Sequence, residues 1–126
     1  MISESAGGYA TDAGAAIPAA FTVVRVPFPF TDRLAAKNRP ALVLSDAAAF
    51  NAPAGHSVLA MITSAGNPPW PLDCGISDLA AAGLPAPSKV RCKLFTLDNR
   101  LVRGTLGRLA EDDEQRVRGA LAALLG

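Results

Sequence analysis

An arginine and two hydroxyl residues stand at the ends of two expected strands of this 126-residue chain, where they could act on a phosphate group. Arg39 begins one apolar run, whereas Thr63 and Ser64 end another. The planar guanidinium of arginine can bond two phosphate oxygens at once. If the two strands are antiparallel neighbours, Arg39 and Thr63 share one end of the sheet, because the start of one strand then lies beside the end of the other. Such a pair can stabilise a phosphoryl transition state without a metal ion. The alternative is that Arg39 is an ordinary surface residue.

Other kinds of catalytic site find little support in the sequence. His56 is the only histidine, which excludes a mechanism with two imidazoles, and we interpret it as an exposed loop residue. The chain has no GxSxG, GxGxxG or Walker motif and no pair of carboxylates on one regular face. Cys74 and Cys92 lack the CxxC spacing of zinc ligands, so we interpret them as small, partly buried thiols rather than as a disulfide or a metal site. We therefore expect no cofactor and no metal.

Charge is unevenly distributed along the chain, although the formal net charge is only +1. Charged residues make up 18% of the chain and apolar residues 50%, which argues against a disordered chain and against binding of nucleic acid by bulk charge. Basic residues instead gather in segments 21–43 and 88–108. The fold could join them into one patch, or both could be ordinary solvated strand faces. No apolar run is long enough to span a membrane and the N-terminus does not resemble a signal peptide, so we expect a cytoplasmic location.

The elements that would position these residues are mostly short strands. Residues 1–20 are rich in Ala, Gly and Ser and are interpreted as a flexible N-terminal extension, followed by one domain over residues 21–126. Strands are expected over residues 21–26, 40–44, 58–63 and 88–95, with two short ones at 101–103 and 105–106. Helices are expected over residues 47–50, 77–82 and 111–125. Alternation within residues 88–95 predicts a basic outer face made of Lys89, Arg91 and Lys93. The pattern favours a mainly β fold, a small and strongly bent antiparallel sheet or barrel with a C-terminal helix.

Five segments of the chain carry a resemblance that none of them would carry alone. They are VVRVPFPFTD (23–32), KNRPALVLS (37–45), LAMITS (59–64), GLPAPSKVRCKLFTLD (83–98) and LGRLAEDDEQRVRGAL (106–121). In these segments and their order, the chain resembles the MazF/PemK family of type II toxin endoribonucleases, the mRNA interferases. The resemblance implies an SH3-like barrel of strongly curved antiparallel strands with a C-terminal helix, usually in a homodimer. It also implies a toxin that cleaves single-stranded RNA (mRNA) at selected sequences by attack of the 2′-hydroxyl, without a metal, and that a cognate antitoxin protein inhibits.

The resemblance also assigns site residues. Arg39, the arginine of the RP motif, and Thr63, near the end of the third strand, match the two positions that family members use at the scissile phosphate. Further substrate contacts are expected beside these two residues and in the loop that joins the first two strands. They are Pro27, Phe28, Phe30, Thr31, Lys37, Asn38 and Ser64. Extruded RNA bases would stack on Phe28, Phe30 and Trp70, for which packing in the core is the alternative.

One departure from the family pattern bears on activity. Family members commonly open the first strand with Gly-Asp-Val, whereas Ala20-Phe21-Thr22 stands in that place here. A catalytically inactive family member is therefore one alternative. Another is a non-enzymatic SH3-like protein, either a gyrase poison of the CcdB type or a module that binds a partner peptide. The RPALVLS motif argues against the gyrase poison.

Overall fold

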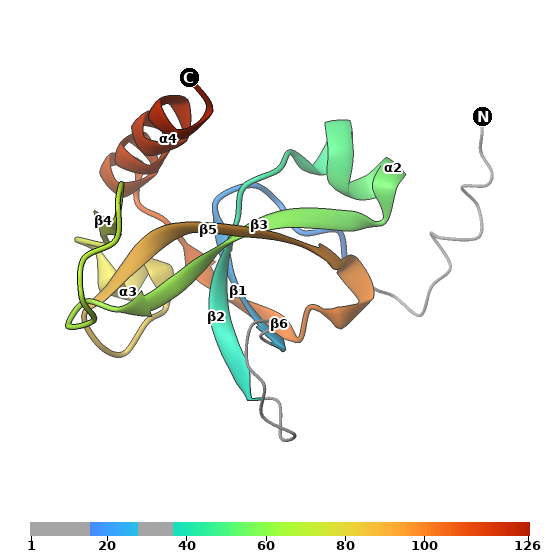
Figure 1. Ribbon diagram of the computed structural model, residues 1–126. Coiled ribbons are helices and arrows are strands. Elements are labelled where there is room, and N and C mark those ends of the chain that lie inside the picture. The colour runs from blue at the N-terminus through green and yellow to red at the C-terminus, as the bar shows by residue number, and fades with distance from the viewer. Residues whose placement is uncertain (1–15, 28–36) are drawn as a thin grey trace.

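The strands of the protein form one antiparallel sheet that curls into a half-barrel (Figure 1). The computed structural model describes residues 16–27 and 37–126. Within these residues the strands are β1 (Thr22–Pro27), β2 (Asn38–Val43), β3 (His56–Ser64), β4 (Cys74–Gly75), β5 (Ser88–Asp98) and β6 (Gly104–Arg108). Their spatial order is β4-β5-β3-β2-β1-β6, and every neighbouring pair is antiparallel. The expected mainly β class with strongly curved strands is confirmed.

Helical segments connect the strands and lie near both ends of β3 and β5 (Figure 1). They are the π-helical turn η1 (Ala47–Asn51), α2 (Ala52–Ala54), α3 (Leu79–Ala82), the 3-10 turn η2 (Asn99–Leu101) and the C-terminal helix α4 (Glu111–Leu125). The carboxylates of Asp46 and Asp78 cap η1 and α3, because each accepts a hydrogen bond from a backbone N–H of the first turn. Helix α4 packs beside β4 and β5 and begins and ends where its apolar spacing predicts (Figure 1).

Apolar side chains pack against both faces of the sheet, which accounts for the nearly continuous apolar runs in its strands. One cluster includes Val23, Leu42, Ile62 and Val90 and is completed by Val117 of α4. The other consists of Val24, Val26, Ala41, Val43, Leu59 and Leu97. Because side chains alternate along a strand, β1, β2 and β3 each contribute to both clusters. The strands that carry the residues at the ends of the sheet are therefore packed on both faces.

Several element boundaries differ from those expected. β2 begins at Asn38 rather than at Pro40, because Pro40 is accommodated opposite Arg25 and the ladder continues to Asn38. The expected strand at residues 101–103 is wrong, since η2 occupies the start of this segment and a single strand, β6, follows it. The two-residue strand β4 has no counterpart among the expected elements. It is too short to produce an alternating pattern in the sequence.

The chain already packs against the body before β1 begins. Pro18 is buried, and its carbonyl oxygen accepts a 2.9 Å hydrogen bond from Nδ2 of Asn51, a fully buried side chain. Phe21 is also buried and belongs to the cluster that includes Val23. The domain boundary between residues 20 and 21 stays a prediction, although contacts with the body start at Pro18. No helix within the described ranges is long and apolar enough to cross a membrane.

Candidate functional site

Arg39 and Thr63 meet at one end of the sheet. β2 and β3 are antiparallel neighbours, with Ala41 opposite Met61 and Val43 opposite Leu59. This ladder ends at Ala41 and Met61, and Arg39 and Thr63 each lie two residues beyond it at the same end of the sheet. Both residues line one groove with a volume of about 540 Å³, which segment 84–88 closes on its other side. The two residues are therefore placed together as the antiparallel argument predicts.

The same row continues onto β5. Thr63 pairs with Lys89 and Met61 pairs with Arg91, and a β-bulge follows beyond Met61, between Met61 and Ala60. β3 thus lies between the basic start of β2 and the basic residues of β5, so the two basic segments of the sequence meet across one strand. The topology therefore brings the basic residues of both segments close together. How much of their positive charge is exposed depends on the partners of each side chain.

Arg39 presents its charge to the groove. Its side chain is exposed, and no carboxylate of residues 16–27 or 37–126 forms an ion pair with it. Arg39 and Asn38 pair with Val26 and Pro27 of β1, which places Pro27 and Asn38 at this end of the sheet as well. Lys37 precedes them and is exposed. Ser64 lines the groove beside Thr63. The remaining expected contacts, Phe28, Phe30 and Thr31, lie outside the described residues.

Lys89 and Arg91 differ from Arg39 because both form ion pairs with one carboxylate, that of Asp73. Lys89 Nζ lies 3.2 Å from Oδ2 of Asp73, and Arg91 bonds both oxygens of Asp73 at 3.1 and 3.0 Å. The Arg91 guanidinium lowers the pKa of Asp73, which burial alone would raise, and Lys89 and the backbone N–H of Trp70 act in the same direction as Arg91. Lys89 is only 9% exposed. The expected basic outer face of residues 88–95 is therefore wrong at Lys89 and Arg91, since the loop carrying Asp73 covers them.

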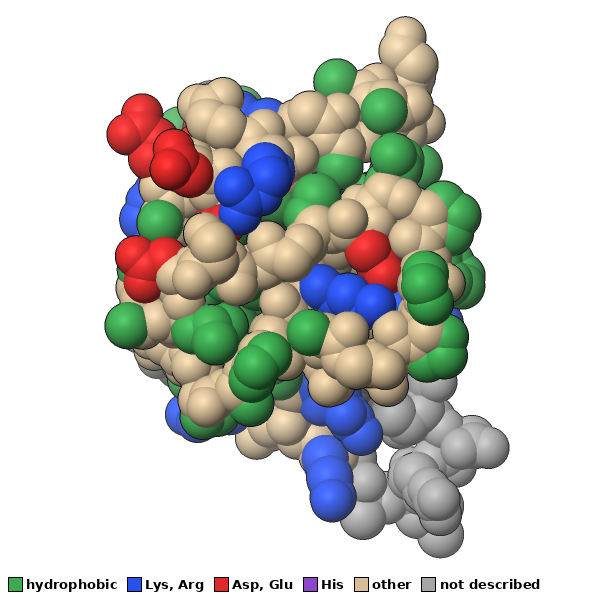
Figure 2. All heavy atoms as spheres, turned by 90° about the vertical axis from the view of Figure 1, so that its left-hand side faces the viewer, with side chains coloured by type: hydrophobic (Ala, Val, Ile, Leu, Met, Phe, Trp, Pro, Cys, Tyr) green, Lys and Arg blue, Asp and Glu red, His purple; other side chains and the backbone are tan. Residues whose placement is uncertain are grey.

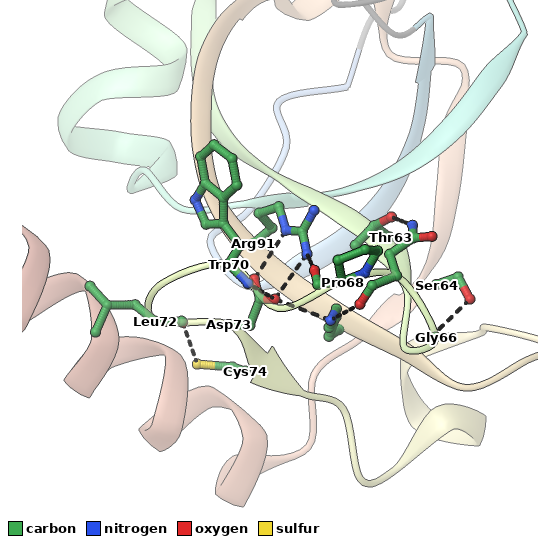
Figure 3. A network of polar contacts seen from close by, with 11 residues as sticks. Thr63, Ser64, Gly66, Pro68, Trp70, Leu72, Asp73, Cys74 and Arg91 are labelled. Carbon is green, nitrogen blue, oxygen red and sulfur yellow. Dashed lines mark hydrogen bonds and ion pairs between the residues drawn. The ribbon is translucent and has the colours of Figure 1, made fainter.

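This loop, residues 65–73, follows β3 and folds over the β5 side of the site (Figure 3). Lys89 Nζ donates to the carbonyl oxygen of Asn67 at 2.7 Å, and Arg91 donates to that of Pro68 at 2.8 Å. The side-chain amide of Asn67 donates to Oγ1 of Thr63 at 2.5 Å. Gly66-Asn67-Pro68-Pro69 is a run of strand-breaking residues, and the sequence indicates nothing further about it. No local pattern reveals that its backbone oxygens are the acceptors for β5.

Trp70 lies at the outer side of the same loop. Its side chain is 43% exposed, so packing in the core does not describe it. Arg91 Cζ and Lys93 Nζ lie 5.5 and 5.7 Å from the centroid of its ring, within the range of cation–π attraction. On the face beyond β4 and α3, acidic, basic and hydrophobic side chains are intermixed rather than gathered in one positive patch (Figure 2).

The other reactive side chains lie outside this groove. His56 is exposed at the first residue of β3, the strand end opposite Thr63. Cys74 and Cys92 are free thiols and half-buried, and burial raises the pKa of each. In the part of the chain that the structure describes, no three His, Cys, Asp or Glu side chains are grouped so that they could hold a metal ion.

The fold and the groove define a small mainly β protein whose curled sheet carries an arginine and a hydroxyl residue at one end, a combination suited to an anionic ligand. The chain belongs to the PemK-like, MazF-like toxin family of type II toxin–antitoxin systems, whose model matches residues 19–125. No curated protein matches the chain significantly.

Solved structures of the same family resemble the chain over most of its length. MazF (Form-I) from Deinococcus radiodurans is 30% identical with a TM-score of 0.68, and the match covers 88% of this chain and 98% of that one. A MazE-MazF structure (Form-II) from the same organism is 28% identical with a TM-score of 0.68, covering 88% and 97%. An endoribonuclease in complex with its cognate antitoxin, from Mycobacterial species, is 21% identical with a TM-score of 0.68, covering 86% and 95%, and supports the fold alone.

Proposed function

We propose that this chain is a toxin that cleaves single-stranded RNA as a metal-independent, sequence-selective endoribonuclease. The observation that carries the proposal is the groove shared by Arg39 and Thr63, in a chain of the MazF-like family. Arg39 brings an exposed charge that no carboxylate of the described residues neutralises, and Thr63 brings a hydroxyl on the neighbouring strand.

The reaction needs charge stabilisation more than it needs a cofactor. The ribose 2′-hydroxyl loses its proton and attacks the neighbouring phosphorus, the bond to the 5′-oxygen breaks, and that oxygen takes up a proton. The products are a 2′,3′-cyclic phosphate and a 5′-hydroxyl. Arg39 neutralises the charge that develops on the phosphorane through two charge-assisted hydrogen bonds. Arginine does not lose its proton in proteins and cannot serve as a general base, so the proposed role of Arg39 is electrostatic.

The proposed RNA contacts around the reacting phosphate lie at the strand ends beside Arg39 and Thr63. Lys37, Asn38 and Pro27 adjoin Arg39, and Ser64 adjoins Thr63. Phe28, Phe30 and Thr31 belong to the segment between β1 and β2 and are proposed as further contacts. Trp70 is proposed as a stacking platform, since stacking of one base on an aromatic ring contributes about 1–3 kcal/mol.

The proposal includes protein partners. A MazE-MazF structure is among the similar ones, so we propose a cognate antitoxin that inhibits this chain. A homodimer in the cytoplasm is the proposed form of the toxin.

The test is cleavage of defined RNA oligomers in excess chelator. We expect cuts at selected positions with cyclic phosphate ends, and a loss of about 10²–10³ in kcat for Arg39→Ala while the fold persists. Absence of cleavage across a panel of RNA sequences by a folded protein would overturn the proposal. RNA containing a single 2′-deoxy residue at the cut position checks the attacking group, because it should remain intact.

A non-enzymatic family member is the second candidate, favoured by one observation. Ala20-Phe21-Thr22 replaces the Gly-Asp-Val that commonly opens the first strand, and Phe21 is 3% exposed, with Arg118 4.5 Å above its ring. This candidate predicts binding of a partner without RNA cleavage. Inhibition of DNA supercoiling would point to a gyrase poison.

A further inference from the structure

We infer that Asn67 is a positioning residue that sets the hydrogen-bond direction of the Thr63 hydroxyl. Its side-chain amide donates to Thr63 Oγ1 over 2.5 Å, and both residues line the groove with Arg39. The inference rests on the proposed cleavage of RNA, because it concerns how Thr63 meets the scissile phosphate.

The chemistry of the two groups fixes the direction of their bond. A threonine hydroxyl has one donor hydrogen and two acceptor lone pairs, whereas the amide nitrogen of asparagine only donates. Oγ1 of Thr63 therefore accepts from Asn67, and its own hydrogen is left to bond another acceptor. An accepted hydrogen bond also polarises the hydroxyl and makes it a stronger donor. In a groove that holds Arg39, the matching acceptor is a phosphate oxygen.

Asn67 can direct Thr63 because the loop itself is fastened. The backbone N–H of Asn67 donates to the carbonyl oxygen of Ser64 at 3.1 Å, and the carbonyl oxygen of Asn67 accepts from Lys89 Nζ at 2.7 Å. Lys89 is nearly buried and is held in turn by Asp73. The charge of Lys89 thus serves to fix the loop over Thr63. A preorganised donor of this kind needs no rearrangement when substrate binds.

Two substitutions of Asn67 distinguish the effect of the hydrogen-bond direction at Thr63 from the effect of the contact alone. Asn67→Ala removes the donor and frees the hydroxyl to rotate, and we expect kcat to fall about tenfold. That loss stays below the ~10²–10³ expected when a transition-state donor such as Thr63 is itself removed. Asn67→Asp has nearly the same shape, but its carboxylate only accepts, so it turns the Thr63 hydrogen away from the groove and adds a negative charge there. We expect it to lower kcat more than Asn67→Ala does.

The experiment measures kcat and KM for each Asn67 variant with Thr63 present and in a Thr63→Ala background. If Asn67 acts through Thr63, Asn67→Ala changes kcat only where the hydroxyl is present and leaves KM close to that of the wild type. Pro69→Ala, in the same loop, is the matched control for a loosened loop and should keep wild-type kcat. Thermal unfolding of every variant shows whether the fold is retained.

A second measurement does not depend on turnover. Affinity for an RNA that carries a 2′-deoxy residue at the cut position should fall for Asn67→Asp in both backgrounds because of the added negative charge, and it should fall further while Thr63 is present. A wild-type kcat in Asn67→Ala, or an equal loss in the Thr63→Ala background, overturns the inference and leaves the proposed nuclease standing. A wild-type protein that neither cleaves nor binds RNA overturns the proposed function, and the role of Asn67 falls with it.

Discussion

At the scale of single residues, the three cations at one end of the sheet are in two different situations. Arg39 is exposed and makes no ion pair with a carboxylate of the described ranges, whereas Lys89 and Arg91 are both bonded to Asp73. Their positions could be predicted from the sequence, because the RP motif and the alternation of residues 88–95 fix the strands. Their partners could not be predicted, because Asp73 reaches them from a loop whose path depends on backbone acceptors.

The shape of the Arg39 side chain should matter as much as its charge. Arg39→Lys keeps the charge but loses the planar fork that bonds two phosphate oxygens, so we expect an intermediate kcat, roughly tenfold or more below the wild type. Lys37→Ala removes an exposed neighbouring charge and should raise KM with little change in kcat. Steady-state kinetics on one RNA oligomer distinguishes the two effects. Full activity of Arg39→Lys would mean that a point charge is sufficient.

At the scale of elements, helix α4 is the best predicted part of the chain and also shows what the sequence hides. Its bounds follow from the apolar spacing and the acidic first turn. Ala110 supplies no side-chain cap, and the sequence suggests no reason for Asp113 to be singled out among the acids. Asp113 is 1% exposed and accepts hydrogen bonds from the backbone N–H groups of Ser77 and Asp78 and from the Ser77 hydroxyl. It thereby ties the segment after β4 to the helix.

Asp113 should make stability depend on pH. Burial raises its pKa, but the hydrogen bonds from Asp78 and Ser77 and the charge of Arg116 outweigh burial, and the net pKa is lowered. A lowered folded-state pKa contributes stability above the unfolded value of about 3.9, and this contribution is lost as pH falls through the folded-state pKa. We expect Asp113→Asn to lower the free energy of unfolding by about 3 kcal/mol at pH 7. Urea unfolding at pH 7 and at decreasing pH should show the difference shrinking in acid, and a constant difference would contradict this role.

A glycine fixes the packing of α3 against β6. Gly83 has a φ of +72°, and a Cβ at this position would collide with the carbonyl of Leu106. Gly83→Ala should therefore destabilise the fold by about 2 kcal/mol or more, since strain and the clash act together. Gly119 in α4 has open space around it, so Gly119→Ala should stabilise by about 0.5–1 kcal/mol. Denaturant unfolding of the pair measures both signs, and equal effects would show that the contact with Leu106 is not restrictive.

At the scale of the whole molecule, the topology brings the two basic segments together, but ion pairs with carboxylates neutralise several of their basic side chains. Asp98 pairs with Arg100 and Glu114 with Arg108, in addition to the pairs of Asp73. Segment charges could be counted from the sequence, whereas this neutralisation depends on contacts between residues far apart along the chain. At the end of the sheet with Arg39, a basic side chain lines a groove and forms no ion pair with a carboxylate of the described residues.

RNA binding by such a molecule should depend weakly on salt. Each phosphate contact with single-stranded nucleic acid contributes about −0.7 to the slope of log K against log salt, so two to three contacts at Arg39 and its neighbours give roughly −2. Arg39→Ala should reduce the slope by about one contact, or 0.7. Arg100→Gln is the matched control, because Arg100 is bonded to Asp98 at the opposite end of β3 and β5, and it should leave the slope unchanged. Fluorescence anisotropy with uncleavable 2′-deoxy-substituted RNA across a salt series measures all three proteins. A slope much steeper than −2, or one that Arg100→Gln reduces as much as Arg39→Ala does, would place the RNA over the wider basic surface instead of at the groove.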